Sequence, residues 1–150
     1  MRAVIQRVSE ASVVIDEQKV AAIQQGLLVL LGVEIEDTKE DVVWLANKIG
    51  QLRIFQDEEG VINKSITESR GEVIVVSQFT LHAKTKKGNR PSYIKAARPQ
   101  QAMPLYESFK EDLSIAISKQ IHSGEFGANM KVSLTNDGPV TIIIDTKNKE

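Results

Sequence analysis

The sequence contains no cysteine, which excludes disulfide bonds, thiolate nucleophiles and zinc ribbons. It has no excess of charge of either sign, because 19 Lys and Arg against 20 Asp and Glu give a net charge of -1. A protein that coats nucleic acid over its whole surface is therefore excluded, and any RNA contact must come from a local basic patch. The longest apolar run, Leu27–Val33, is far too short to cross a bilayer.

Familiar catalytic motifs are also missing. The sequence has no Gly-x-Ser-x-Gly elbow, no His-Glu-x-x-His, no Walker loop and no Gly-x-Gly-x-x-Gly. Of the two histidines, His122 is expected at a helix end in a capping or solvated role, whereas His82 follows a strand and is better placed to act as a base. Residues 1–8 lack the long apolar stretch and the small-residue cleavage site of a secretory signal, so we expect a cytoplasmic protein.

What is present is typical of one globular domain covering residues 1–150, with 41% apolar and 26% charged residues. Alternating and β-branched segments predict strands at 2–8, 12–15, 20–24, 27–33, 72–78, 130–135 and 140–146. The run 27–33 is nearly all apolar, as expected for a strand that is buried on both faces. Asn136-Asp137-Gly138-Pro139 is expected to form a turn between the last two strands.

Two helices are predicted between these strands. Thr38 and Asp41 have the spacing of a capping box, and apolar residues at helical spacing follow them to about Leu52. The second helix is expected to end near Ser123-Gly124, with one apolar face formed by Tyr106, Phe109, Leu113, Ile117 and Ile121. Each helix needs a sheet face to cover. We therefore expect an α/β domain: a three-layer β/β/α sandwich of curved, mostly antiparallel or mixed sheets, with the two helices packed outside.

Residues 83–99 differ from the rest of the chain. They contain two prolines, one glycine, no acidic residue and six basic residues, Lys84, Lys86, Lys87, Arg90, Lys95 and Arg98. This composition predicts a long surface loop, and loops of this length inside compact domains are often functional. The alternative is an ordinary solvated loop.

Two segments carry the remaining chemical information. Ser77-Gln78-Phe79-Thr80-Leu81 interrupts an apolar strand with polar groups at its C-terminal end. These residues either continue the strand, with Phe79 in the core, or line a pocket with hydroxyls, an amide and free backbone N–H groups. Asn136-Asp137-Gly138-Pro139 is either a plain turn or a stiff one that presents bare carbonyls at close range, since Gly138 has no side chain.

Together these two segments resemble the D-aminoacyl-tRNA deacylase family. Both match the family's signature, Ser77-Gln78-Phe79-Thr80-Leu81 and Asn136-Asp137-Gly138-Pro139-Val140-Thr141. The resemblance extends over nearly the whole chain, through residues 1–8, 87–93 and 126–130. Tyr93 stands where many members have Phe, a change that keeps the aromatic ring.

The resemblance implies a homodimeric hydrolase that cleaves the ester of D-aminoacyl-tRNA, and of glycine mischarged on tRNA, at the tRNA 3′ end. Gly138-Pro139 of one subunit, in cis, would enter the partner's pocket and reject L-aminoacyl-tRNA. Arg7 would hold that turn, and Met130 would form part of the pocket wall.

The catalytic segment implied by the resemblance comprises Ser77, Gln78, Phe79 and Thr80, with backbone amides near Phe79 and Thr80 stabilising the oxyanion. The tRNA 2′-hydroxyl would assist in place of a protein nucleophile. Lys84, Lys86, Lys87 and Arg90 are the candidate RNA contacts, and no metal, organic cofactor, membrane or DNA is implied.

Two other functions remain open from the residues alone. One is a non-catalytic RNA-binding module that uses the basic loop, although that loop has a single aromatic residue, Tyr93, for base stacking. The other is an esterase with Thr80 as the nucleophile, for which His82 or a neighbouring hydroxyl would have to act as the base.

Overall fold

A six-stranded curved sheet forms the centre of the computed structural model, which describes residues 1–150. Its strands run in the order β2-β1-β3-β6-β7, and β8 pairs with β1 outside this path. The bounds are β1 (Arg2–Ile15), β2 (Gln18–Ile23), β3 (Gly26–Gly32), β6 (Glu72–Ser77), β7 (His122–Ser123) and β8 (Lys131–Asp145). The β3–β6 and β6–β7 pairs are parallel, and all pairs that involve β1 are antiparallel.

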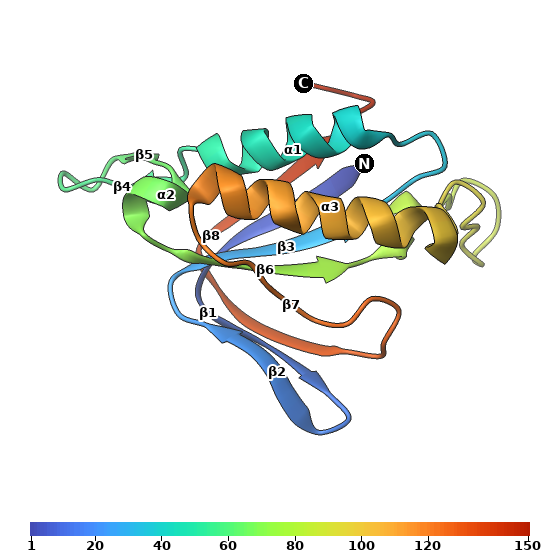
Figure 1. Cartoon of the computed structure of the whole chain (residues 1–150), viewed down its shortest axis with the longest axis horizontal. Coiled ribbons are helices and arrows are strands. Elements are labelled where there is room, and N and C mark those ends of the chain that lie inside the picture. Colours follow the sequence, from blue (N-terminus) through green and yellow to red (C-terminus); the bar gives the residue numbers. More distant parts are fainter.

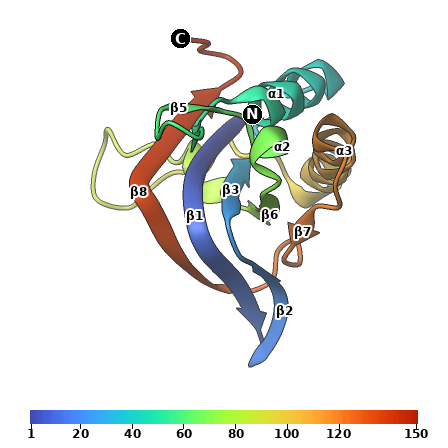
Figure 2. The ribbon, with the colours of Figure 1, turned by 90° about the vertical axis from the view of Figure 1, so that its left-hand side faces the viewer.

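Strand β1 organises the sheet. One of its edges pairs first with β3, through residues 2–8, and then with β2, through residues 11–15. Its other edge pairs with β8 from Arg2 to Val14. β1 and β8 bend together away from β3 (Figure 2). The second half of this long ribbon therefore folds over one face of the sheet, and the long helices lie on the other.

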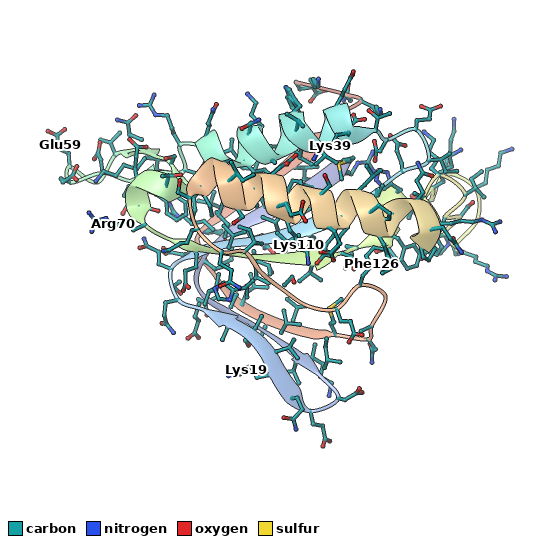
Figure 3. The ribbon with its side chains drawn as sticks, in the orientation of Figure 1. Lys19, Lys39, Glu59, Arg70, Lys110 and Phe126 are labelled. Carbon is teal, nitrogen blue, oxygen red and sulfur yellow. The ribbon has the colours of Figure 1, made fainter.

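Helices α1 (Lys39–Gln51) and α3 (Pro99–Ile117) lie side by side across the opposite face of the sheet (Figure 1). The short helix α2 (Ile66–Ser69) and the hairpin of β4 (Phe55–Gln56) and β5 (Ile62–Lys64) lie at one end of them. Charged side chains such as Lys19, Glu59 and Arg70 project from the periphery (Figure 3). No helix combines the length and the apolar character that crossing a membrane requires.

Two apolar clusters confirm the expected three layers. The larger one fills the space between the helices and the sheet, with Leu45, Ile49, Tyr106, Phe109 and Leu113 against Ile5, Leu27, Val29 and Val75. The smaller one lies on the other face, where Leu28, Ile74 and Val76 meet Val8, Val13 and Ile23. Strand β3 contributes to both clusters, which explains its unbroken apolar run.

Several predicted boundaries were wrong. The expected strands at 2–8 and 12–15 form one strand, β1, because β8 pairs with it throughout. The second long helix ends at Ile117 rather than near Ser123-Gly124, since Ser118 adopts a left-handed conformation (φ 54°) and caps it. Ile121 therefore lies beyond the helix, and His122 lies in β7, where its Nε2 is 3.2 Å from a Glu72 carboxylate oxygen.

The segment 136–139 is not a turn between two strands. Both of its flanks pair with β1, so residues 131–145 form one strand, β8. The register passes from Gln6↔Thr141 to Val8↔Asn136, so four residues, 137–140, lie opposite the single residue Arg7. The predicted turn is therefore a four-residue bulge in a continuous β-ribbon.

Candidate active site

The C-terminal end of β6 leads into a tight turn. Strand β6 ends at Ser77, the Gln78 N–H donates to the Leu31 carbonyl (2.8 Å), and a 3-10 helix, η1, covers Phe79–His82. The first hydrogen bond of η1 runs from the Leu81 N–H to the Gln78 carbonyl (3.3 Å). The N–H groups of Phe79 and Thr80 precede that bond, so the turn itself leaves them without an acceptor.

The side chains of η1 do not alternate between the two faces of the sheet, as they would in a continued strand. Phe79 is 55% exposed, which excludes the alternative in which its ring packs in the core, because the chain leaves the strand conformation one residue earlier. The ring instead packs edge-on against Tyr93, with 5.0 Å between the ring centroids. The Thr80 hydroxyl oxygen accepts a hydrogen bond from the Gln78 side-chain amide (2.6 Å).

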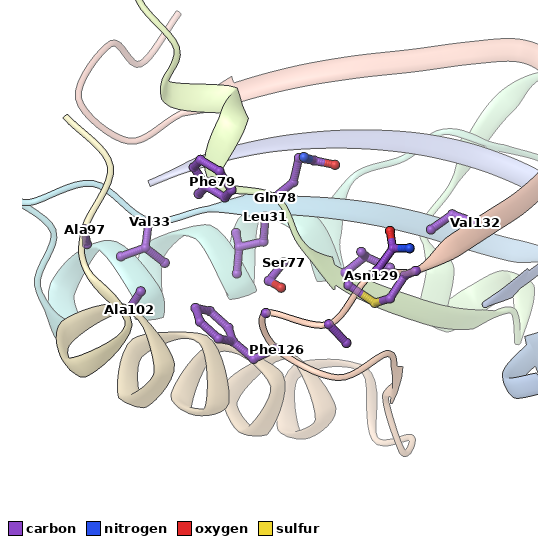
Figure 4. A pocket seen from close by; sticks show the side chains of 14 residues that line it. Leu31, Val33, Ser77, Gln78, Phe79, Ala97, Ala102, Phe126, Asn129 and Val132 are labelled. Carbon is purple, nitrogen blue, oxygen red and sulfur yellow. The ribbon is translucent and has the colours of Figure 1, made fainter. Parts of the chain in front are cut away.

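A cavity of about 280 Å³ lies beside this turn. Ser77, Gln78 and Phe79 line one side of it, and Phe126 and Asn129 lie across from them (Figure 4). Met130 also lines the cavity. The remaining lining is small or apolar: Leu31, Val33, Val76, Ala97, Ala102, Gly127, Ala128 and Val132. The cavity therefore offers apolar walls, two aromatic rings and a few polar groups near the strand end.

The Phe126 ring packs against the ring of Tyr106. The two ring centroids are 5.5 Å apart, and the Tyr106 hydroxyl donates to the Val75 carbonyl (3.0 Å). Burial raises the pKa of Tyr106 to about 12, so its hydroxyl stays protonated and keeps donating at neutral pH. Helix α3 thus fixes one wall of the cavity through Tyr106.

Two side chains, those of Arg2 and His82, fix the position of η1. Arg2 Nη1 donates to the Leu81 carbonyl (2.6 Å), while its Nε and Nη2 donate to Asp145. Burial works to raise the pKa of Asp145, but the Lys147 N–H and the Arg2 guanidinium outweigh it and hold that pKa below its usual range. The buried His82 ring fits against Gly32, where an added Cβ would lie 3.0 Å from the ring.

A second cluster of predicted residues lies on the bulge of β8. Arg7 is buried, and its Nε donates to the Asp137 carbonyl (2.9 Å) while Nη1 donates to the Ile54 carbonyl (2.7 Å). The Gly138–Pro139 bond is cis, and Gly138 has a φ of 135°. An added Cβ at Gly138 would lie 2.9 Å from Val140 Cγ2 and 3.0 Å from Arg7 Nη2, so only glycine fits there.

The structure brings the predicted residues into two groups. Ser77, Gln78, Phe79 and Met130 line the cavity, and Thr80 lies in the adjoining turn. Arg7, Gly138 and Pro139 form the second group and do not line the cavity of their own chain. Phe126 and Asn129 belong to a segment that the sequence marked as a family block, but no role was predicted for them.

The basic loop begins directly after η1. Residues 83–98 form no helix or strand, apart from two isolated bridges, Lys84 with Ser92 and Ala96 with Glu34, as predicted for a surface loop. Its cations, Lys84, Lys86, Lys87, Arg90, Lys95 and Arg98, are all exposed. Tyr93 connects the loop to the site through its contact with Phe79.

The chemistry of the site follows from these positions. Two backbone donors lie at a strand end beside an apolar cavity, and no group of three or more His, Asp or Glu side chains is gathered in a way that would hold a metal ion. The fold and site thus define a layered α/β protein whose candidate site consists of backbone hydrogen-bond donors and shaped apolar walls.

Comparisons with known proteins agree with this class. The sequence profile described as D-Tyr-tRNA(Tyr) deacylase matches residues 4–145. Curated relatives named D-aminoacyl-tRNA deacylase include those of Bacteroides fragilis, 64% identical, and Parabacteroides distasonis, 59% identical, each alignment covering 100% of both chains. The chain therefore belongs to the D-aminoacyl-tRNA deacylase family.

Solved structures show the same fold. One titled c-Myc DNA Unwinding Element Binding Protein superposes with a TM-score of 0.91 at 42% identity, over 97% of this chain and 98% of the other. A probable eukaryotic D-amino acid tRNA deacylase gives 0.82 over 95% and 97%, and its 17% identity makes that likeness one of fold alone.

Proposed function

We propose that this protein hydrolyses the ester bond of D-aminoacyl-tRNA and releases the free D-amino acid and the tRNA. The observation that carries the proposal is the pair of N–H groups of Phe79 and Thr80, which η1 leaves without acceptors beside the cavity. Two such donors are suited to the oxyanion that develops when an ester carbonyl is attacked. The family relationship supplies the substrate class.

In the proposed reaction a water oxygen attacks the ester carbonyl, and the oxyanion accepts hydrogen bonds from these two N–H groups. The bond to the tRNA 3′-oxygen then breaks, and that oxygen takes up a proton as the carboxylic acid leaves. The neighbouring 2′-hydroxyl assists, so no protein nucleophile is needed. One oxyanion donor contributes about 10²–10³ in rate, which suits an already activated ester.

The cavity is suited to the terminal nucleoside of the tRNA. Its apolar walls and the face of Phe126 match a planar base, and its small residues, Ala97, Ala102, Gly127 and Ala128, leave room for one. A base seated there would direct its ribose towards Ser77 and η1, where the ester has to lie.

We further propose that the site is completed by a second subunit, whose Gly138-Pro139 bulge enters the pocket. Asp137, Gly138 and Pro139 are exposed, and so is Phe79 on the rim of the pocket. Ile143 is 67% exposed and pairs with Val4 in the β1–β8 ribbon. It lies between the bulge and Asp145, which pairs with the Arg2 side chain that contacts η1. Mutual insertion would place the two-fold axis near Ile143 and cover these apolar side chains.

The proposed bulge also explains chirality. If the amino group, the hydrogen and the ester of the substrate's α-carbon are fixed, L and D residues differ in where the side chain points. A rigid backbone in the L direction rejects L residues by collision and leaves D side chains free. Glycine has no side chain to collide, so glycyl-tRNA is a predicted substrate as well.

The exposed cations of the basic loop are the proposed tRNA contacts, namely Lys84, Lys86, Lys87 and Arg90. A few phosphate contacts would give weak, salt-sensitive binding without sequence readout. The function proposed for residues 1–150 is that of one domain working in the cytoplasm, where aminoacyl-tRNA is used.

Hydrolysis of D-Tyr-tRNA and L-Tyr-tRNA by the wild type and by Thr80→Ala and His82→Ala variants tests the proposal. We expect D-selective hydrolysis that survives both substitutions. No hydrolysis by the folded wild type would indicate a non-catalytic RNA-binding module instead. Activity abolished by Thr80→Ala alone would indicate a Thr80 nucleophile.

A further inference from the structure

The base of the Gly138-Pro139 bulge is closed by side chains on the face opposite Arg7. The two residues that flank the bulge, Asn136 and Thr141, are linked directly, because Asn136 Nδ2 donates to Thr141 Oγ1 (2.9 Å). Asn136 Oδ1 accepts the Val140 N–H (3.0 Å). Since a backbone N–H can only donate, this bond fixes which end of the Asn136 amide is the oxygen.

A neighbour on β1 extends this network. Gln6, whose register partner is Thr141, places its Nε2 3.4 Å from Thr141 Oγ1. Alternate residues of a strand point to opposite faces of a sheet, so Gln6 and Arg7 approach the bulge from different sides. Arg7 contacts the Asp137 carbonyl from the buried side, whereas Asn136 and Thr141 lie on the more exposed side.

We infer that Asn136 and Thr141 form a clasp that sets the position of the Gly138-Pro139 bulge, and that both are specificity-determining positioning residues. The reasoning is geometric. Four residues of β8 lie opposite one residue of β1, so the sheet's own hydrogen bonds cannot fix the bulge. Its position therefore depends on side chains at its two ends, and the clasp joins these ends while Arg7 holds one carbonyl within.

This inference rests on the proposed rejection of L-aminoacyl-tRNA by the bulge. A clasp that opens lets the bulge move away from the L side-chain direction. Its loss should therefore raise hydrolysis of L-Tyr-tRNA relative to D-Tyr-tRNA, a readout that a purely stabilising role would leave unchanged. Loss of one neutral hydrogen bond corresponds to about a threefold to tenfold change in this ratio.

The sharpest test uses Thr141→Val, which keeps the β-branched shape and removes the hydroxyl, beside Thr141→Ser, which keeps the hydroxyl. Thr135→Val is the matched control, because Thr135 is exposed on the same strand outside the clasp. The measurement is the ratio of kcat/KM for L-Tyr-tRNA to that for D-Tyr-tRNA. We expect the ratio to rise about threefold to tenfold in Thr141→Val, and to stay within about twofold of wild type in Thr141→Ser and Thr135→Val.

Asn136→Ala provides a second route if Thr141→Val does not fold, and it should raise the ratio at least as much because it removes two bonds. Arg7→Ala separates the two proposals. A ratio raised by Arg7→Ala but unchanged in folded Thr141→Val and Asn136→Ala would overturn the clasp. A ratio unchanged in all of them, Arg7→Ala included, would overturn the role proposed for the bulge itself.

Discussion

At the scale of single residues, Arg7 has an unusual position. Its guanidinium is buried, and it compensates for the loss of water by donating to two backbone carbonyls from distant segments, at Ile54 and Asp137. Charge-assisted hydrogen bonds of this kind contribute about 1.5–3 kcal/mol each. The side chain thus connects the bulge of β8 to the loop that precedes the β4–β5 hairpin.

Arg7→Ala should relax the selectivity for D substrates. Without the guanidinium the Asp137 carbonyl has no side-chain donor, and the bulge can shift from the position that excludes L side chains. We expect L-Tyr-tRNA hydrolysis to rise relative to D-Tyr-tRNA by about tenfold, which corresponds to about 1.4 kcal/mol of weakened rejection. Matched deacylation assays measure this ratio. An unchanged ratio in a folded, dimeric variant would remove Arg7 from the account.

Phe79→Ala should reduce D-Tyr-tRNA hydrolysis more than Thr80→Ala does. The Phe79 ring packs on Tyr93 and borders the cavity, whereas the Thr80 hydroxyl has one neutral partner, Gln78. We expect about a tenfold or larger loss of kcat for Phe79→Ala and a loss of less than about fivefold for Thr80→Ala. A neutral hydrogen bond and an aromatic pair each contribute about 0.5–1.5 kcal/mol. The loss is larger for Phe79 because its side chain also borders the substrate. Single-turnover rates of folded variants decide between them. Inactive Thr80→Ala beside near-normal Phe79→Ala would contradict catalysis by the backbone.

At the scale of elements, the sequence predicted best those segments whose structure depends on residues close in sequence, or whose surroundings are apolar on every side. Helix α1 follows from Thr38, Asp41 and helical spacing, and β3 follows from its apolar run. The bulge in β8 could not be predicted, because Asn-Asp-Gly-Pro has the residue chemistry of a tight turn and only the pairing of both flanks with β1 excludes one. The position of Phe79 stayed open for a similar reason, since the polar residues that interrupt the strand at Ser77 are compatible both with a continued strand and with the turn into η1.

Asp41 provides an element-scale prediction about acid stability. Burial works to raise the pKa of Asp41, but hydrogen bonds from the Thr146 hydroxyl, the Thr38 N–H and Lys147 outweigh it and hold the pKa well below its usual range. A carboxyl with a depressed folded pKa stabilises the fold above its unfolded pKa of about 3.9, and this stabilisation disappears as the pH falls through the folded value.

Asp41→Asn keeps an acceptor for the Thr38 N–H and removes the charge. We expect it to lower the thermal midpoint at pH 7 by about 2–4 °C, as a loss of about 1 kcal/mol would do in a domain of this size. The difference from wild type should shrink progressively below about pH 4. Thermal melts between pH 2 and pH 7 measure it, and a difference that does not vary with pH would show that the charge of Asp41 is unimportant.

The basic loop provides a second element-scale prediction. Replacing Lys86, Lys87 and Arg90 together by Gln should weaken D-aminoacyl-tRNA binding and flatten its salt dependence, with little change in the single-turnover rate at saturation. Removing one cation that binds a phosphate should reduce the slope of log K against log salt by roughly 0.7–0.9. Binding titrations at several salt concentrations test this, and an unchanged slope would locate the tRNA surface elsewhere.

At the scale of the whole molecule, different parts of the layered fold carry the cavity and the bulge. The helices and β3 build a rigid, well-packed core, which holds η1 and the cavity wall in place. The bulge lies on the β1–β8 ribbon and does not line that cavity in its own chain. Both halves of the proposed site are thus present in one chain but apart from each other, which is the arrangement expected of a site shared between two subunits.

Ile143→Lys should disrupt the proposed dimer. A charge near a two-fold axis meets its own copy, and burying it is costly. We expect the variant to sediment as a folded monomer at micromolar concentration and to lose most D-Tyr-tRNA hydrolysis, whereas Ile115→Lys, at a side chain that is 77% exposed on α3, should leave both unchanged. A fully active monomer would contradict the shared site.

The central claim is that the bulge of one subunit completes the pocket of the other, and a mixed dimer tests it most directly. One subunit carries Phe79→Ala, which disables its pocket, and the other carries Arg7→Ala, which loosens its bulge. In a shared site the one working pocket receives the intact bulge from the Phe79→Ala subunit, so the account predicts a ratio of L-Tyr-tRNA to D-Tyr-tRNA hydrolysis within about twofold of wild type, the small excess coming from the weakened Phe79→Ala pocket. A ratio as high as that of the Arg7→Ala homodimer would show that each bulge serves its own chain and would contradict the account.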